Sequence, residues 1–113
     1  MTQITFAALM FLLVGLLYIG LGIPLLQGRI PPNRFYGSRT RKTLSNEKIW
    51  YAVNRVTGRD LIIGGIAVVI TASGIYLYGQ SLAPTHAAFI LLTVLVVSAI
   101  VMVVNTLLAQ RTM

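Results

Sequence analysis

The sequence contains no cysteine, only two acidic residues and a single histidine. Without cysteine, the chain has no disulfide, no thiolate metal site and no cysteine nucleophile. The only histidine, His86, and the two acids, Glu47 and Asp60, fall on opposite sides of the membrane in the topology predicted below. No cluster of metal ligands, no glycine-rich phosphate loop and no activated nucleophile can be identified. We therefore expect no enzymatic activity, no cofactor and no metal.

Charge as a whole is scarce. Charged residues make up 10% of the 113 residues and hydrophobic residues 57%, whereas soluble domains carry about 25% charged residues. The net charge is +7, and eight of the nine basic residues lie between Arg29 and Arg59, the ninth being Arg111. A basic chain can indicate nucleic-acid binding. Here the charge is confined between apolar runs, which favours an anionic membrane surface and argues against nucleic acid.

Three apolar runs without charge cover residues 4–26, 61–78 and 87–108. The hydrocarbon core of a bilayer needs about 20 apolar residues of helix. The runs therefore predict an all-α membrane protein with three transmembrane helices and a single domain, residues 1–113. No basic residue precedes the first run, so we interpret it as an uncleaved span and not as a signal peptide.

Three spans place the 27–60 connector and the C-terminus on one side and the N-terminus on the other. Every lysine and arginine then falls on the first side. The positive-inside rule predicts a multi-pass protein of the inner (plasma) membrane, with the 27–60 loop and the C-terminus cytoplasmic and the N-terminus outside.

The connector divides into an extended part and a helical part. Pro31 and Pro32 disfavour helix, and Asn33 and Gly37 favour turns, so residues 28–42 should form a basic loop. Four basic residues of this loop are expected to contact lipid phosphates: Arg29, Arg34, Arg41 and Lys42.

Ser45 is a candidate N-cap for a short amphipathic helix over residues 46–57. Trp50 and Val53 belong to its apolar face, which is expected to lie on the inner membrane surface. The sequence leaves open whether this helix ends at Gly58 or continues into the second span.

Small residues form a stripe on each of the first two predicted spans. The first span has Ala8, Gly15 and Gly22 at a spacing of seven, and the second has Gly64, Ala67, Thr71 and Gly74. Because lipid tails provide no hydrophobic force between helices, small residues promote close helix packing. We expect the two stripes to face each other or another subunit, so that a homo-oligomer remains an alternative.

The run IPPNRFYGSRTRKTLSNEKIWYAVNRVTG resembles the signature of the SdpI/YfhL family of small bacterial membrane proteins. Twelve positions match at fixed spacing: Pro31, Pro32, Asn33, Gly37, Arg39, Thr40, Thr43, Leu44, Trp50, Asn54, Arg55 and Gly58. Two positions depart from the family pattern, since Arg41 stands where proline is usual and Ser38 where a bulky apolar residue is usual.

The resemblance implies immunity against a membrane-active peptide toxin, and in the member that names the family also signalling through a bound repressor. An alternative reading of the motif is purely architectural. A competing function is an accessory or lipid-organising subunit whose loop binds anionic lipid. A small multidrug transporter is disfavoured because the spans carry no charge, and a pore-forming lysis protein because the connector is long and ordered.

Overall fold

The computed structural model describes residues 2–111, which are built almost entirely of helix. Helix α1 comprises Gln3–Leu26, α2 Arg41–Ser45, α3 Glu47–Tyr78 and α4 Pro84–Arg111. Three of the four, α1, α3 and α4, are long and apolar enough to cross a membrane. The protein is thus an all-α membrane protein with three transmembrane helices, as the sequence predicted.

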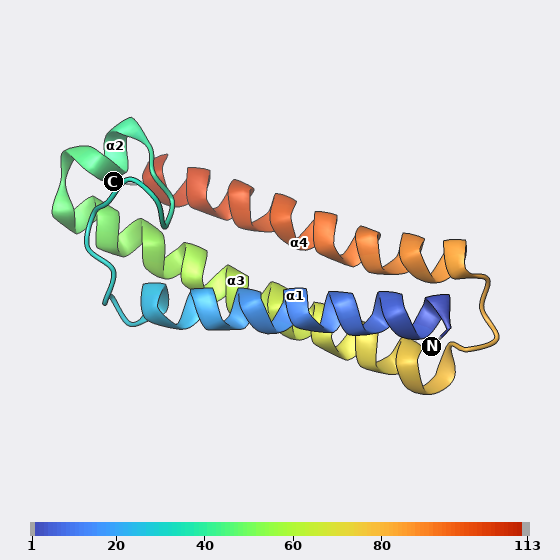
Figure 1. The fold of residues 1–113 in the computed structure, drawn as a ribbon. Helices are drawn as coiled ribbons and strands as arrows, with labels where there is room; N and C mark the ends of the chain where they lie inside the picture. Colours follow the sequence, from blue (N-terminus) through green and yellow to red (C-terminus); the bar gives the residue numbers. More distant parts are fainter. Residues whose placement is uncertain (1, 112–113) are drawn as a thin grey trace.

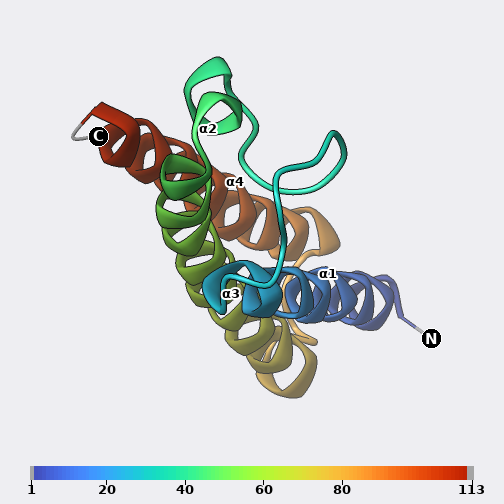
Figure 2. The same cartoon turned by 90° about the vertical axis from the view of Figure 1, so that its left-hand side faces the viewer.

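The three long helices lie side by side, with α3 in contact with both α1 and α4 (Figures 1 and 2). The N-terminal end of α1 and the α3–α4 turn lie at one end of the molecule. The connector, α2 and the C-terminal end of α4 lie at the other (Figure 1). Arg111 therefore shares an end with the basic connector, as the count of spans required.

Helix α3 is one unbroken helix of 32 residues. At 1.5 Å per residue it is about 48 Å long, against about 30 Å for a hydrocarbon core. The amphipathic helix predicted over residues 46–57 exists as the first turns of α3, and Gly58 does not end it. We call residues 27–57, which include the loop, α2 and these first turns, the basic cap.

The predicted start of this helix is wrong by one residue. Ser45 is the last residue of α2, and the N-cap of α3 is Asn46, whose side chain accepts hydrogen bonds from the backbone N–H groups of Lys48 and Ile49. The short helix α2 was not predicted. It begins at a capping box in which Thr40 and Thr43 each bond the backbone of the other.

The apolar face at the start of α3 does not lie on a membrane surface. Trp50 and Val53 are both fully buried, and the Trp50 indole N–H donates to the carbonyl of Ile30 in the loop, 2.8 Å away. The expectation fails because α3 continues the direction of its span, so the loop folds over this face in place of lipid.

Small residues bring the backbones of α1 and α3 into direct contact. Gly22 lies opposite Gly58 and Gly15 opposite Gly65: a Cβ on Gly22 would come within 2.6 Å of the Gly58 carbonyl oxygen, and one on Gly65 within 2.6 Å of the Gly15 carbonyl oxygen. The first-span stripe therefore packs against a stripe on α3 with the same spacing of seven. Both helices have glycine at these contact points, so no side chain keeps the backbones apart, as expected for close helix packing in a membrane.

The stripe predicted on the second span is not the one that faces α1. A Cβ on Gly64 would meet Ser98 of α4, and one on Gly74 would meet nothing within 4 Å. Ala67 lines a cleft toward α4. Thr71 donates its hydroxyl to the Ala67 carbonyl, 2.8 Å away in its own helix. Successive residues are rotated by about 100° around the helix axis, so the stripe that begins at Gly64 faces a direction about 100° from the stripe that begins at Gly65.

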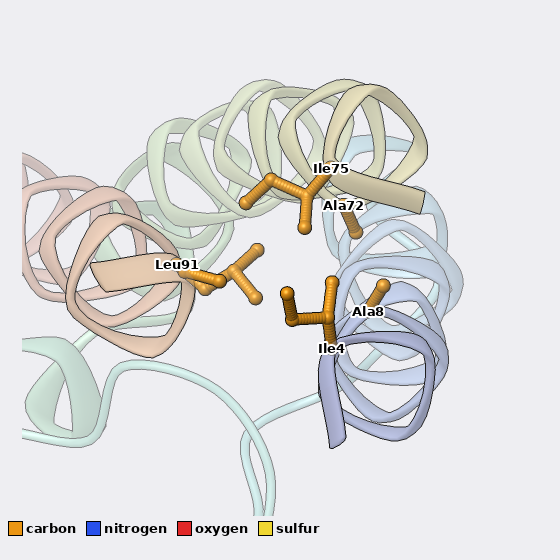
Figure 3. Packing of buried hydrophobic residues seen from close by; sticks show 6 residues of the cluster. Ile4, Ala8, Ala72, Ile75 and Leu91 are labelled. Carbon is orange, nitrogen blue, oxygen red and sulfur yellow. The ribbon is translucent and has the colours of Figure 1, made fainter. Parts of the chain in front are cut away.

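At the end away from the basic cap, all three long helices meet in a small hydrophobic cluster. Ile4 and Ala8 of α1, Ala72 and Ile75 of α3 and Leu91 of α4 point toward one another (Figure 3). This cluster fixes the start of α4 against the other two helices.

Candidate functional site

The loop of the basic cap is held by Asn33. Its side-chain oxygen accepts from the backbone N–H of Phe35 at 2.8 Å and of Tyr36 at 2.7 Å, and its amide donates to the Pro31 carbonyl at 2.8 Å. Such bonds make an Asx turn, which pre-forms the loop after the two prolines. Pro32 is half-buried and Arg34 is exposed.

This turn directs Phe35 and Tyr36 to different places. The Tyr36 hydroxyl donates a hydrogen bond to the Leu21 carbonyl in α1, and burial raises the pKa of the Tyr36 phenol above its ordinary value. Phe35 is 91% exposed. The loop is therefore attached to α1 by one aromatic residue and presents the other outward.

Gly37, Trp50 and Asn54 form the joint between the loop and α3. The Asn54 side-chain oxygen accepts from the Ser38 backbone N–H at 2.6 Å, and its amide donates to the Trp50 carbonyl at 3.0 Å. Gly37 has a φ of +109°, and a Cβ there would lie 2.8 Å from the Asn54 oxygen. Glycine is required both by the conformation and by the space.

The remaining motif residues take different roles. Thr43 is fully buried, and its hydroxyl donates to the Ser38 carbonyl at 3.0 Å. Arg39, Leu44 and Arg55 are exposed. Of the four residues expected to contact lipid phosphates, Arg29, Arg34 and Arg41 are exposed, whereas the Lys42 ammonium donates to the Gln110 carbonyl of α4.

A chain of hydroxyl and amide groups connects the basic cap to the end of α4. Ser38 and Thr57 share a hydrogen bond of 2.6 Å between their hydroxyls, and Thr57 shares one of 2.9 Å with Thr106. The Thr40 hydroxyl donates to the Gln110 side-chain oxygen at 2.7 Å. We call this set the α4 clamp.

The clamp was missed from the sequence. A signal for it exists in the sequence, because Thr106 and Gln110 are polar and four residues apart on one face of a largely apolar helix. Side chains at this spacing lie on one face of a helix, and a polar face within a membrane span predicts a polar partner on another helix.

Asp60 lies beside the clamp and is almost buried. Its carboxylate accepts from the Asn105 amide at 2.9 Å and pairs with the Arg59 guanidinium at 3.1 Å, the Arg59 side chain being 51% exposed. This is the only salt bridge within residues 2–111. Asn105 thus fastens α4 to α3.

Between the clamp and the hydrophobic cluster, α3 and α4 separate around a cavity of about 340 Å³. We call it the α3–α4 cleft. Its lining is almost entirely apolar or small: Asp60, Ile63, Gly64, Ala67, Thr93, Val94, Val97, Ser98 and Val101. Helix α4 is therefore held at its two ends and touches α3 between them, where Gly64 meets Ser98, and the cleft lies beside this contact.

No group of three or more histidine or acidic side chains lies close enough to hold a metal ion in the part of the chain that the structure describes. His86 is exposed in the first turn of α4, and the start of α4 lies at the opposite end of the molecule from the start of α3 (Figure 1).

These features define a small multi-pass membrane protein with three transmembrane helices and an ordered basic cap on one end. The model of the SdpI/YfhL protein family matches residues 29–106, and the chain belongs to this family. The matched segment covers nearly all of the cap, including α2, all of α3 and most of α4. No curated protein and no solved structure gives a significant match.

Proposed function

We propose that this protein protects the membrane that contains it against a membrane-active peptide, and that the α3–α4 cleft receives an apolar part of that peptide. Family membership over residues 29–106 supports the class of function. The observation that carries the site is the cleft itself, an apolar hollow of about 340 Å³ between two helices.

The lining of the cleft suits a helical or extended apolar segment. Gly64 meets Ser98 at the cleft, and the small side chains of Ala67 and Ser98 allow a partner to approach closely inside a bilayer. Helix α4 has few buried residues, namely Ala87, Leu91, Thr106 and Gln110. These contacts lie at its two ends, and a peptide in the cleft would lie beside the Gly64–Ser98 contact without breaking them.

The test fills the cleft by replacing one valine of its lining with phenylalanine. Val97 and Val96 are adjacent on α4 and are 53% and 52% exposed, but only Val97 lines the cleft. The wild type and the Val97→Phe and Val96→Phe variants are expressed at equal membrane levels in a sensitive bacterial host. The cells are then challenged with a neutral and with a cationic pore-forming helical peptide.

The wild type should raise the lethal dose of at least one peptide severalfold, Val96→Phe should match it, and Val97→Phe should lose most of the gain. If the inserted wild type protects against neither peptide, immunity to these classes is excluded. If both variants protect equally, the cleft is not the site.

Signalling through a repressor is a second candidate that the family suggests. Any such partner would have to contact the cap, where Phe35 is 91% exposed on an ordered turn. We propose this contact only as an addition to immunity. The topology that both functions require, with the cap in the cytoplasm, would be tested by labelling a single cysteine at position 39 in intact cells. A cysteine labelled from outside would contradict it.

A further inference from the structure

Two basic residues of the cap, Lys48 and Arg55, lie together on the first turns of α3. Lys48 and Arg55 make no side-chain hydrogen bond and no ion pair within residues 2–111. They are seven residues apart on α3, so they lie on one face, about 10 Å from each other along the helix. Tyr51 lies between them on the same face.

The face is concave where it meets the end of α1. A cavity of about 440 Å³, which we call the basic pocket, is lined by Gly28, Lys48, Tyr51, Ala52 and Arg55. No acidic residue lines it; Asp60 is occupied by Arg59 and Asn105, and Glu47 lies outside the lining. The pocket is therefore positively charged.

The wall opposite α3 is formed by the turn that ends α1. Gly28 has a φ of +71°, its N–H donates to the Leu25 carbonyl at 3.2 Å, and the N–H of Arg29 donates to the Pro24 carbonyl at 3.0 Å. These bonds make a Schellman motif. A Cβ on Gly28 would lie 3.2 Å from an Arg55 guanidinium nitrogen, so glycine leaves the space that the guanidinium occupies.

The position of the pocket relative to the bilayer limits what it can bind. Gly58 lies opposite Gly22, so Arg55, one turn earlier on α3, lies at the level where α1 ends. A hydrocarbon core ends near the last apolar turn of such a helix, and the headgroup layer beyond it is about 5–8 Å thick. Arg55 thus lies at the inner edge of the headgroup layer and Lys48 near its outer edge.

We infer that the basic pocket binds the phosphate-bearing headgroup of one anionic glycerophospholipid from the adjacent leaflet. A guanidinium can bind phosphate oxygens with two parallel hydrogen bonds, and an ammonium and a phenol hydroxyl can donate to others. The positive charge of Arg55 beside the C-terminus of α1 also interacts favourably with the dipole of that helix. That role alone requires neither Lys48, nor Tyr51, nor a cavity.

The site is tested on the full chain, purified in a neutral detergent and titrated with phosphatidylglycerol or phosphatidylcholine. Native mass spectrometry counts the lipid retained, and thermal unfolding measures the stabilisation by bound ligand. The wild type should retain one phosphatidylglycerol per chain and bind it on the order of tenfold or more tightly than Lys48→Gln/Arg55→Gln does. Arg39→Gln/Arg111→Gln, with the same change of charge at two exposed residues outside the pocket, should retain the lipid.

Three outcomes would overturn the inference. Equal losses in the two double variants would show diffuse attraction without a site. Binding of phosphatidylcholine as tightly as phosphatidylglycerol would remove the role of charge. Equal stabilisation by inorganic phosphate at the same concentration would assign the pocket to a free anion. Lys48→Gln alone and Tyr51→Phe, checked for native helix content by circular dichroism, keep the test valid if the Arg55 variant does not fold: both should bind phosphatidylglycerol more weakly than the wild type.

Discussion

The two helix interfaces of this molecule are built on opposite principles. Between α1 and α3 the backbones touch through facing glycines and no side chain separates them. Between α3 and α4 the contact is made by polar groups at one end and by a hydrophobic cluster at the other, with a cavity between them beside the single close approach of Gly64 to Ser98. The first interface is suited to holding a fixed geometry, and the second to admitting a partner.

The largest effect is expected from breaking the tight interface. In Gly58→Ala the new Cβ would lie 2.6 Å from the Gly22 carbonyl oxygen, so the backbones must separate. Overpacking of this kind costs about 1–3 kcal/mol. Unfolding by SDS titration, followed by circular dichroism, should show this loss of stability.

The matched control for the tight interface is Gly74→Ala on the same helix, where the new Cβ meets nothing within 4 Å. It should be neutral, or stabilising by up to about 1 kcal/mol through helix propensity. If the two alanine variants unfold at the same SDS concentration, the backbones of α1 and α3 are not in close contact.

A smaller effect is expected from loosening one end of the open interface. Thr106→Val keeps the shape of the side chain but removes the hydrogen bond to Thr57, which is worth about 0.5–1.5 kcal/mol. Hydrogen exchange in the last two turns of α4 should accelerate, while exchange in α1 stays unchanged.

The double variant Thr57→Val/Thr106→Val provides the control for the clamp. It should cost less than the sum of the two single variants, because each single change already breaks the shared bond. Strict additivity would mean that the two hydroxyls do not interact.

The smallest effect concerns the contact of the loop with α1 and depends on pH. Because burial raises the pKa of Tyr36, the folded protein holds the phenol proton more tightly than the unfolded chain does. The stabilisation is complete below the unfolded pKa of about 10 and is lost as pH rises through the higher folded value. The difference in unfolding midpoint between wild type and Tyr36→Phe should therefore narrow above about pH 10. A difference independent of pH, or one shared by Tyr51→Phe, would contradict this assignment.

The number of spans, and the placement of the basic connector and the C-terminus at one end, could be predicted because they depend on hydropathy and charge, which are read directly from the chain. The first-span stripe of Ala8, Gly15 and Gly22 was also visible, since a spacing of seven keeps residues on one face. Its partner on α3 was not identified, because glycines lie on two neighbouring faces of that helix and only the packing decides which one meets α1.

The cap was harder to predict for a physical reason. The periodicity of Trp50 and Val53 indicates one buried face, but it does not say whether lipid or protein covers that face. The hydrogen bonds of Trp50 to Ile30 and of Asn54 to Ser38 decide it, and they connect residues 20 and 16 positions apart. The α4 clamp joins residues 49 and 70 positions apart, so the spacing of Thr106 and Gln110 indicates a polar face on α4 but does not identify its partner.

The unbroken course of α3 has a mechanical consequence. About 12 of its residues extend beyond the membrane-spanning part, which makes a stiff arm of about 18 Å attached to a helix that lies in the bilayer. A change of about 10° in the tilt of that helix would sweep the tip of the arm sideways by about 3 Å. Any change in the bilayer that alters the tilt of α3 therefore displaces the water-exposed end of the helix, and no hinge is needed.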